Sequence, residues 1–485
     1  MIPEPDVIKP QDLPMKKTAF LFLCLLCGSA YAQVSVDATR TFLQEKGKPF
    51  FWLADTGWEL FHRLSREEAR HYLDIRQQQG FNVVMAVALG ELDGIRKPND
   101  YGDRPFKSLA PLKWDATPGN DPANAAEYDY WDHVDFVIRE AAKRNMYIGL
   151  LPAWGDKVVP GAAGPVIFTN PGIAFAYAKK LAERYKDQKN IIWILGGDRP
   201  AVAGAADYRP VWRAMAKAIQ EVMGRDIFIA YHPQQRTSAY FKEEDAWLSI
   251  NAIQSGHAAR DIRVWDLVSA GLKAVPKRPF MDLEPCYEDH PVFPWDGQWT
   301  RAGRGYFSDY DVRARIYRGV FSGGCGAVYG HHQVWQFTDT SRNKPLFIGD
   351  TLIGWKKAIQ SPGAWQMQHL KKLLLAHPDF HREEDSLLIA SDRGTNYRDR
   401  IIATRNQKKT YALIYLPQPH TIRVNLDRLQ QGNKKISWFD PVTGASHLLP
   451  QQYDRGIQTF DPPAKEPKDW VLVIDISGFA LKAAL

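Results

Sequence analysis

The stretch NIIWILGGD, residues 190–198, decides the fold class. Its apolar run is typical of a parallel strand buried on both faces, and it ends in two glycines and Asp198. Seven other stretches share this character. They are PFFWLADT (49–56), FNVVMAVAL (81–89), MYIGLLPAW (146–154), DIFIAYHP (226–233), AWLSINAIQSGH (246–257), RPFMDLEP (278–285) and GAVYGHH (326–332). The sequence therefore predicts eight buried strands.

Helical segments separate these strands. SREEARHYLDIRQQQG (65–80) has acidic residues in its first turn and a glycine at its end, and PGIAFAYAKKLAERYKDQ (171–188) has Asn170 as N-cap before Pro171. Strand–helix units over residues 43–375 predict an α/β fold of the (β/α)8 TIM-barrel type. The alternative is a doubly wound open sheet, but no glycine-rich dinucleotide fingerprint follows the first strand.

The chain changes character after residue 380, where helical patterns stop and short strands follow one another. These strands are SLLIASD (386–392), IIATRN (401–406), TYALIYLP (410–417), HTIRVNLD (420–427), KKISWFD (434–440), ASHLLP (445–450) and DWVLVIDIS (469–477). Turn signals lie between them, and several alternate in polarity. We expect a small antiparallel β-sandwich domain over residues 380–485.

Composition narrows the classes of function. Of the 485 residues, 45% are hydrophobic, so the chain can bury a sizeable core and is not intrinsically disordered. The formal net charge is +7, but Lys and Arg are interleaved with acids along the chain, which argues against a nucleic-acid partner. The aromatic content of 12% suits clefts that stack against sugars. We therefore expect a polysaccharide or oligosaccharide partner.

Residues 15–32, MKKTAFLFLCLLCGSAYA, have the three parts of a signal peptide. Two lysines precede an apolar run at 19–27, and residues 30–32 form an A-x-A cleavage pattern that leaves Gln33 as the mature terminus. No later stretch reaches about 18 apolar residues, so no membrane span is predicted. The expected location is the periplasm or the outside of the cell.

Residues 1–14 precede this segment and contain three acids and four prolines, so we expect translation to begin at Met15. The mature chain then keeps two cysteines, Cys286 and Cys325. They could pair in an oxidising compartment, but spacing alone leaves both the paired and the free state open.

Chemically versatile side chains gather at the predicted strand ends. In a barrel enzyme the active site lies at the C-terminal ends of the strands, so these side chains are expected to ring one mouth. They are Asp55, Trp58, Trp154, Asp198, His232, His257, Glu284, His331, His332 and Trp335.

The carboxylates at the ends of the fourth and seventh strands, Asp198 and Glu284, are the most informative pair. Retaining glycosidases need two carboxyl groups about 5–5.5 Å apart, one as nucleophile and one as acid/base. The placement resembles that in the large superfamily of barrel glycosidases, where the acid/base follows strand 4 and the nucleophile ends strand 7. That superfamily has Glu after Asn at strand 4, whereas this chain has Asp after two glycines. The acid/base arm is therefore one methylene shorter.

Each carboxylate also has a structural interpretation. Asp198 could cap the next helix or pair with Arg199, and Glu284 could belong to an ion pair. Asp282 lies two residues before Glu284, so we expect it on the same side but deeper. There it would support Glu284 or replace it as nucleophile.

The histidines allow two interpretations. His232 and His257 could each orient a carboxylate or touch substrate. His331 and His332 are adjacent, so we expect only one to point into the mouth. A zinc site built from these histidines is an alternative, but the first strand lacks a His-x-His pair and no HExxH motif occurs. We therefore expect no metal and no cofactor.

The roles of three tryptophans and of the acid on the first strand also have two interpretations each. Trp58, Trp154 and Trp335 could be core residues or sugar platforms. Asp55 is expected to hydrogen-bond sugar hydroxyls, or else to hold the first loop.

Four runs carry a resemblance to a known family. FFWLADTGWELFHRLSREE (50–68), YIGLLPAWGDK (147–157), NIIWILGGDRP (190–200) and GGCGAVYGHHQVWQF (323–337) resemble the apiosidase-like catalytic domain of glycoside hydrolase family 140. This resemblance implies a barrel in which the Asp of the GGD motif, Asp198, is the acid/base and the strand-7 Glu, Glu284, is the nucleophile. It also implies release of apiose from rhamnogalacturonan II side chains of pectin.

The tail, residues 383–475, resembles the collagen-binding domain that often follows this barrel, a name from which we infer no collagen binding. Two classes of function remain open. The first is a secreted retaining glycosidase, either apiosidase-like or of different sugar specificity. The second is a non-catalytic carbohydrate- or matrix-binding protein. The Asp198/Glu284 pair favours the enzyme, because a binding protein has no need of two acids there.

Overall fold

The computed structural model describes residue 1 and residues 34–161, 164–293, 295, 303–339, 341–342, 353–464 and 468–476. The predicted signal peptide at 15–32, the segment at 1–14 and the predicted terminus Gln33 lie outside these residues. No helix in the described part of the chain combines the length and apolar character that crossing a bilayer requires.

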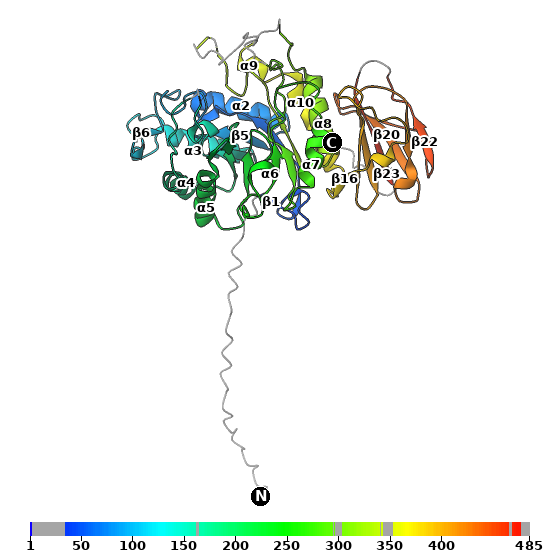
Figure 1. The fold of residues 1–485 in the computed structure, drawn as a ribbon, viewed down its shortest axis with the longest axis horizontal. Helices are drawn as coiled ribbons and strands as arrows, with labels where there is room; N and C mark the ends of the chain where they lie inside the picture. Colours follow the sequence, from blue (N-terminus) through cyan, green and yellow to red (C-terminus); the bar gives the residue numbers. More distant parts are fainter. Residues whose placement is uncertain are drawn as a thin grey trace. The chain divides into compact units, whose positions relative to one another are not determined.

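All eight predicted barrel strands are present, and their ladder pairs are parallel. They are β4 (Trp52–Thr56), β5 (Val83–Val87), β8 (Tyr147–Leu151), β9 (Ile191–Gly196), β12 (Ile229–His232), β13 (Asn251–Ile253), β14 (Phe280–Asp282) and β15 (Gly326–Tyr329). Figure 1 shows one of these strands, β5, among the helices of the barrel. Six of the eight strands pair in the order β12-β9-β8-β5-β4-β15, and β13 pairs with β14. Each strand therefore lies beside its neighbour in the chain, and β15 returns to β4.

Two backbone hydrogen bonds join the strand pair to the six-stranded sheet. The Ser249 N–H, just before β13, donates to Ile229 O of β12 at 2.9 Å. The Cys325 N–H, just before β15, donates to Phe280 O of β14 at 2.8 Å. The sheet is thus curled into a closed (β/α)8 barrel, and the doubly wound alternative is wrong. Cys325 and Cys286 are both buried and free, so they do not pair.

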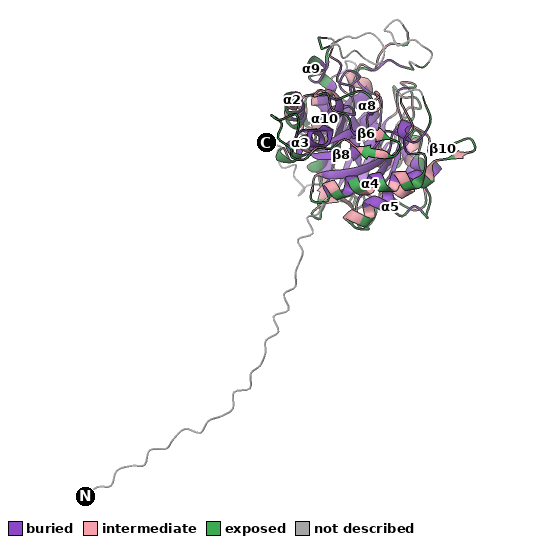
Figure 2. Cartoon of the chain, turned by 90° about the vertical axis from the view of Figure 1, so that its left-hand side faces the viewer, coloured by how far each residue is buried: buried purple, intermediate pink, exposed green. Residues whose placement is uncertain are grey.

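Side chains alternate between the barrel interior and the helix layer, as the period of a strand requires. The interior cluster includes Trp52, Ala54, Val83, Met85, Val87, Tyr147, Leu151, Ile192, Ile194, Ala230, Ala252, Met281 and Val328. The alternate residues join the core between strands and helices. Both sets are apolar because both faces of the sheet are covered. Figure 2 shows the buried strand β8 together with α4 (Pro171–Tyr185) and α5 (Arg209–Met223), whose residues range from buried to exposed.

The helices follow the strands as predicted. They are α1 (Leu60–Arg63), α2 (Arg66–Gln78), α3 (Tyr130–Lys143), α4 (Pro171–Tyr185), α5 (Arg209–Met223), α6 (Thr237–Tyr240), α7 (Val264–Leu272), α8 (Asp309–Phe321), α9 (Trp355–Ala358) and α10 (Pro362–Leu375). The predicted N-cap of α4 is confirmed, because Asn170 Oδ1 accepts from the Ile173 N–H at 3.1 Å. Ser65 and Glu68 form a capping box at the start of α2.

Short antiparallel elements decorate the barrel. They are β1 (Ser35–Val36), β2 (Leu43–Glu45) and β3 (Lys48–Phe50), then β6 (Phe106–Leu109) with β7 (Leu112–Trp114), and β10 (Val202–Ala203) with β11 (Ala206–Asp207). Val34, Leu43 and Phe50, in and around the first sheet, join the interior cluster next to Tyr147, the first residue of β8. They close the end of the barrel opposite the strand C-termini.

The C-terminal region is a two-sheet antiparallel domain. Its larger sheet has the order β16 (Arg382–Glu384), β17 (Ile402–Asn406), β18 (Tyr411–Leu416), β23 (Trp470–Ile476), β20 (Lys434–Phe439) and β21 (Ser446–Leu448). The smaller one pairs β19 (Ile422–Asn425) with β22 (Ile457–Phe460). An apolar core lies between them, with members from both sheets such as Leu416, Ile422, Trp438 and Phe460.

One predicted strand of this domain is wrong. SLLIASD begins with a 3-10 turn, η3 (Ser386–Leu388), because the Asp385 carboxylate accepts from the Leu387 N–H at 3.1 Å and turns the chain. After this turn, Ile389 makes a single bridge to Val424. The strands β16 and β22 were not predicted, since both are short and carry polar or exposed residues.

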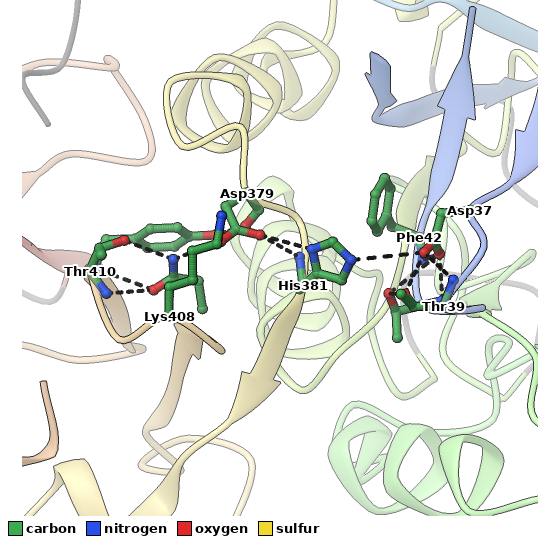
Figure 3. Close-up of polar contacts among 10 residues, drawn as sticks. Asp37, Thr39, Phe42, Asp379, His381, Lys408 and Thr410 are labelled. Carbon is green, nitrogen blue, oxygen red and sulfur yellow. Dashed lines mark hydrogen bonds and ion pairs between the residues drawn. The ribbon is translucent and has the colours of Figure 1, made fainter. Parts of the chain in front are cut away.

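A polar junction connects this domain to the start of the barrel (Figure 3). His381 lies between two carboxylates, with Nδ1 3.0 Å from Asp379 and Nε2 3.9 Å from Asp37. The second Asp379 oxygen accepts from Asn406 Nδ2 at 3.0 Å. Residues on the β1–β2 turn, the linker and β17 are therefore held by one chain of contacts.

Candidate active site

Glu284 lies just beyond the end of β14, with 7% of its surface exposed. Its Oε2 is 2.9 Å from His232 Nε2, at the end of β12, and its Oε1 is 3.2 Å from His257 Nε2, beyond β13. Gln254 Nε2 also donates to Oε2 at 3.0 Å. Burial by itself would raise the pKa of Glu284, but the two imidazoles outweigh it and hold that pKa well below its usual range. The carboxyl group is therefore ionised at neutral pH.

Backbone amides fix which nitrogen of each imidazole carries the proton. His232 Nδ1 accepts from the Asp198 N–H at 3.3 Å, and His257 Nδ1 accepts from the Tyr287 N–H at 3.4 Å. A neutral imidazole that accepts at Nδ1 has its proton on Nε2. In each ring the proton is therefore on Nε2, the nitrogen that lies close to a Glu284 oxygen.

Asp198 reaches the mouth through a turn that requires its two glycines. Gly196, Gly197 and Asp198 have φ values of +88°, +122° and +39°. A Cβ on Gly197 would lie 2.7 Å from the Trp154 ring, and a Cβ on Gly196 would lie 2.3 Å from His232 O. Glycine supplies both the positive φ and the space. The GGD sequence thus places a carboxyl group on a tightly packed turn after β9.

The electrostatics of Asp198 are opposite to those of Glu284. Partial burial, and then the negative charge of Glu284, raise the pKa of Asp198. Arg199 opposes this rise, with Nη1 3.1 Å from Asp198 Oδ2, so the predicted structural pairing is also present. The other end of this guanidinium, Nη2, is 3.1 Å from Glu91 Oε1. Arg199 therefore serves two carboxylates rather than neutralising Asp198 alone.

Gln254 and Tyr287 belong to this site and were not predicted. The Gln254 side chain is hydrogen-bonded to both Glu284 and Asp198, so the two carboxyl groups lie within reach of one amide. The Tyr287 hydroxyl accepts from Trp58 Nε1 at 2.9 Å and interacts with Glu284. Gln254 could have been found from its place at the end of the sixth strand, whereas Tyr287 lies on a loop without a sequence signal.

The tryptophans form the floor of the mouth. Trp58 and Trp154 are each 3% exposed, and their ring centroids are 5.1 Å apart. Each centroid lies 5.5 Å from that of His232. Trp335 is half-buried against the same cluster. Trp58 and Trp154 thus enclose His232 as core residues do, and Trp335 is the more accessible of the three.

Asp55 does not reach the mouth, which corrects the expectation that it binds sugar hydroxyls. It follows Ala54, which faces the interior, so its side chain faces the helices. Its Oδ2 accepts from Arg76 Nε at 2.8 Å and from the Tyr72 hydroxyl, both on α2. The alternative expectation is that Asp55 holds the first loop; the structure shows a structural role, in which Asp55 binds helix α2.

The two adjacent histidines make different contacts. His331 faces away from the mouth, because its Nδ1 accepts from the Gln333 N–H at 3.1 Å and its Nε2 is 3.0 Å from Ser361 Oγ, before α10. The His332 ring meets His290 edge-on, with centroids 4.7 Å apart, and His290 stacks on His257 at 3.9 Å. His290 therefore lies between His332 and His257, one of the two histidines that contact Glu284.

The expectation that Asp282 lies on the same side as Glu284 is also wrong. It lines a small cavity with Arg315 and Gly319 of α8, so it faces the helix layer rather than the mouth. Its Oδ1 accepts from the Ser255 and Glu284 N–H groups at 3.1 and 3.3 Å. The strand ends at Asp282, so the two-residue period does not extend to Glu284. Asp282 braces the nucleophile candidate and is not placed to replace it.

A barrel whose strand ends hold one ionised carboxylate and one carboxyl group of raised pKa has the two kinds of group that a glycoside hydrolase uses. Family comparison agrees. The model described as the apiosidase-like catalytic domain matches residues 36–381, and that described as "Putative collagen-binding domain of a collagenase" matches residues 384–475. The chain belongs to the apiosidase-like family of glycoside hydrolases.

Solved structures support this assignment. A glycoside hydrolase from Bacteroides vulgatus, described as a family 5 member, is 31% identical with a TM-score of 0.80, over 93% of this chain and 94% of its own. A second structure, described as a glycoside hydrolase, is 30% identical with a TM-score of 0.78, over 92% of this chain and 97% of its own. No curated protein matches the chain.

Proposed function

We propose that the protein is a secreted retaining glycosidase that releases apiose from the rhamnogalacturonan II side chains of pectin. The observation that carries the mechanism is the opposite electrostatic setting of its two carboxyl groups. Glu284 is held ionised by His232 and His257, whereas Asp198 has a raised pKa beside it. A retaining reaction needs one ionised nucleophile and one protonated acid.

In this mechanism a Glu284 oxygen attacks the anomeric carbon as the glycosidic bond breaks. Asp198 gives its proton to the leaving oxygen, and the sugar stays bound to Glu284 as a glycosyl ester. Asp198, now ionised, takes a proton from water, whose oxygen attacks the same carbon and releases Glu284. Arg199, 3.1 Å from Asp198 Oδ2, stabilises the carboxylate between the two steps.

The sugar and the location rest on different support. Family membership favours apiose, and no observation on this chain favours another sugar. The signal-like sequence at 15–32 favours export, with Gln33 as the mature terminus. N-terminal sequencing of the native protein tests export, because an intact chain recovered from the cytoplasm would contradict it.

The decisive experiment incubates the protein with rhamnogalacturonan II and other pectin fractions. Released monosaccharides are identified by chromatography, and proton NMR follows the configuration of the first product. Apiose released with retention supports the proposal in full, and Glu284→Gln is the control that should release nothing. Release of a different sugar would correct the substrate, and inversion would correct the mechanism. Release of no sugar would favour the binding-protein alternative.

A further inference from the structure

The geometry assigns His232 a second duty, the coupling of the two catalytic carboxyl groups. One edge of its ring orients Glu284, and the other edge holds the backbone that carries Asp198. His232 is thus a positioning residue for the acid/base as well as for the nucleophile. This inference rests on the proposed function, because it concerns how Asp198 and Glu284 are kept in register.

His232 holds two consecutive amides of the turn that ends in Asp198. Its backbone oxygen accepts from the Gly197 N–H at 3.0 Å, and its Nδ1 accepts from the Asp198 N–H at 3.3 Å. The strands β12 and β9 are in register here, with His232 opposite Gly196. Asp198 has φ +39°, a conformation that a residue other than glycine keeps only when its surroundings hold it there. The His232 ring supplies one of those restraints.

The ring itself has little freedom to move. His232 is fully buried, and the indoles of Trp58 and Trp154 lie against it with centroids 5.5 Å away. With Nδ1 held by the Asp198 N–H, Nε2 lies 2.9 Å from Glu284 Oε2. A shift of either carboxyl group is therefore transmitted to the other through one rigid ring.

The short arm of Asp198 makes this restraint matter. Aspartate has one methylene fewer than glutamate, so the position of its carboxyl group depends more directly on the backbone. Acid catalysis demands hydrogen-bond reach of the leaving oxygen, and small misplacements are costly in rate. Loss of the amide restraint should therefore weaken the protonation step in particular.

His257 provides a matched comparison within the same site. Its Nε2 also contacts Glu284, at 3.2 Å from Oε1, but its Nδ1 accepts from Tyr287 rather than Asp198. The two histidines thus share the contact with the nucleophile and differ in the second partner. Any effect specific to Asp198 should follow His232 and not His257.

Two substitutions separate the two edges of the ring. Gln places an amide nitrogen near the position of Nε2, so His232→Gln keeps a donor to Glu284 and loses the acceptor for Asp198. Asn places an amide oxygen near the position of Nδ1, so His232→Asn does the reverse. His257→Gln is the control. Each variant is assayed on the natural oligosaccharide, which needs an acid, and on the 4-nitrophenyl glycoside of the released sugar, which does not.

We expect kcat/KM of His232→Gln to fall about 10-fold to 100-fold more on the oligosaccharide than on the nitrophenyl glycoside. His232→Asn should lose activity on both substrates alike, and His257→Gln should show no selective loss. Equal selectivity of His232→Gln and His257→Gln would overturn the inference. Asp198→Asn is run in parallel, since the absence of leaving-group dependence there would refute the proposed function itself, and the inference with it.

A measurement on the unsubstituted protein tests the same inference even if a variant does not fold. In ¹⁵N-histidine-labelled protein, NMR at neutral pH should show His232 as the Nε2–H tautomer, with Nδ1 as an acceptor. A proton on Nδ1 would exclude the Asp198 hydrogen bond and end the argument.

Discussion

The ends of strands β9, β12 and β14 differ from those of β4 and β15 in where their polar groups point. Asp198, His232 and Glu284 converge on one another in the mouth. Asp55 and His331, at comparable places in the sequence pattern, turn to the helices and bind Arg76 and Ser361. The two groups look alike in the sequence, but one gathers around a pair of carboxyl groups and the other binds the surrounding helix layer.

Glu284→Gln should produce the largest effect, and it tests the group of residues that converge in the mouth. The amide has no nucleophilic charge, so turnover on every glycoside, activated or not, should fall by about 10⁴-fold or more. The measurement is kcat/KM on oligosaccharide and nitrophenyl substrates. Asp282→Asn is the neighbouring control and should retain far more activity. Near-native rates in Glu284→Gln would remove Glu284 from the role of nucleophile.

Asp198→Asn should come next, with a loss that depends on the leaving group. We expect about 10²- to 10⁴-fold lower rates on the oligosaccharide and a smaller loss on the nitrophenyl glycoside, because nitrophenolate leaves without a proton. Added azide should partly restore turnover by replacing the water that Asp198 activates. An equal loss on both substrates, with no rescue by azide, would contradict the acid/base role.

Asp55→Asn tests the second group of strand-end residues, those that bind the helix layer. The change leaves the Arg76 guanidinium buried without its anion, so we expect the free energy of unfolding to fall by about 3–5 kcal/mol. The folded fraction should keep a kcat/KM within a few-fold of the wild type. Urea unfolding followed by fluorescence measures the first quantity and active-site titration normalises the second. A large loss of kcat/KM at unchanged stability would contradict this structural role and show that Asp55 acts in the mouth.

The junction between barrel and β-domain offers another structural test. Asp469, before β23, accepts from Arg313 of α8 at 2.7 and 2.8 Å and from the Tyr415 hydroxyl at 3.0 Å. Removing this buried anion by Asp469→Asn should cost about 3 kcal/mol. Calorimetry should show the two regions unfolding less cooperatively. The exposed pair Arg209–Asp207 is the control, and Asp207→Asn should change stability by less than about 1 kcal/mol.

The sequence predicts the barrel strands well for a physical reason. Strands buried on both faces are continuous apolar runs, and all eight runs became strands. The same property hides which face each residue takes. Around Asp55 both the inward Ala54 and the outward Leu53 are apolar, so the pattern does not show that Asp55 faces outward.

The sequence pattern indicates the candidate residues that lie at strand ends or shortly after them. His232 ends β12, and Asp198, His257 and Glu284 follow β9, β13 and β14. Tyr287 lies on the loop after β14, and its hydroxyl reaches Glu284 through tertiary folding alone. The 3-10 turn at Ser386 escaped prediction for a related reason, because one side-chain cap from Asp385 outweighs an apolar run.

The smallest predicted effect is a titration shift in Asp198, and it tests whether the mouth works as one electrostatic unit. Burial, and then the negative charge of Glu284, disfavour the ionised form of Asp198, which keeps its proton to higher pH. Glu284→Gln removes that charge while preserving volume, so the pKa of Asp198 should move down towards its usual range. Carbon-13 NMR of labelled aspartate carboxyls measures the shift in a variant that is otherwise inactive. Glu45→Gln, on β2 at the opposite end of the barrel, should leave the Asp198 titration in place.

The pH dependence of activity in the unsubstituted enzyme has the same sign. Activity should decline as pH rises through the raised pKa of Asp198, because the acid is lost while Glu284 stays ionised. An Asp198 titration unaffected by Glu284→Gln would mean that the two carboxyl groups do not sense each other, and the division of roles between them would have no electrostatic basis.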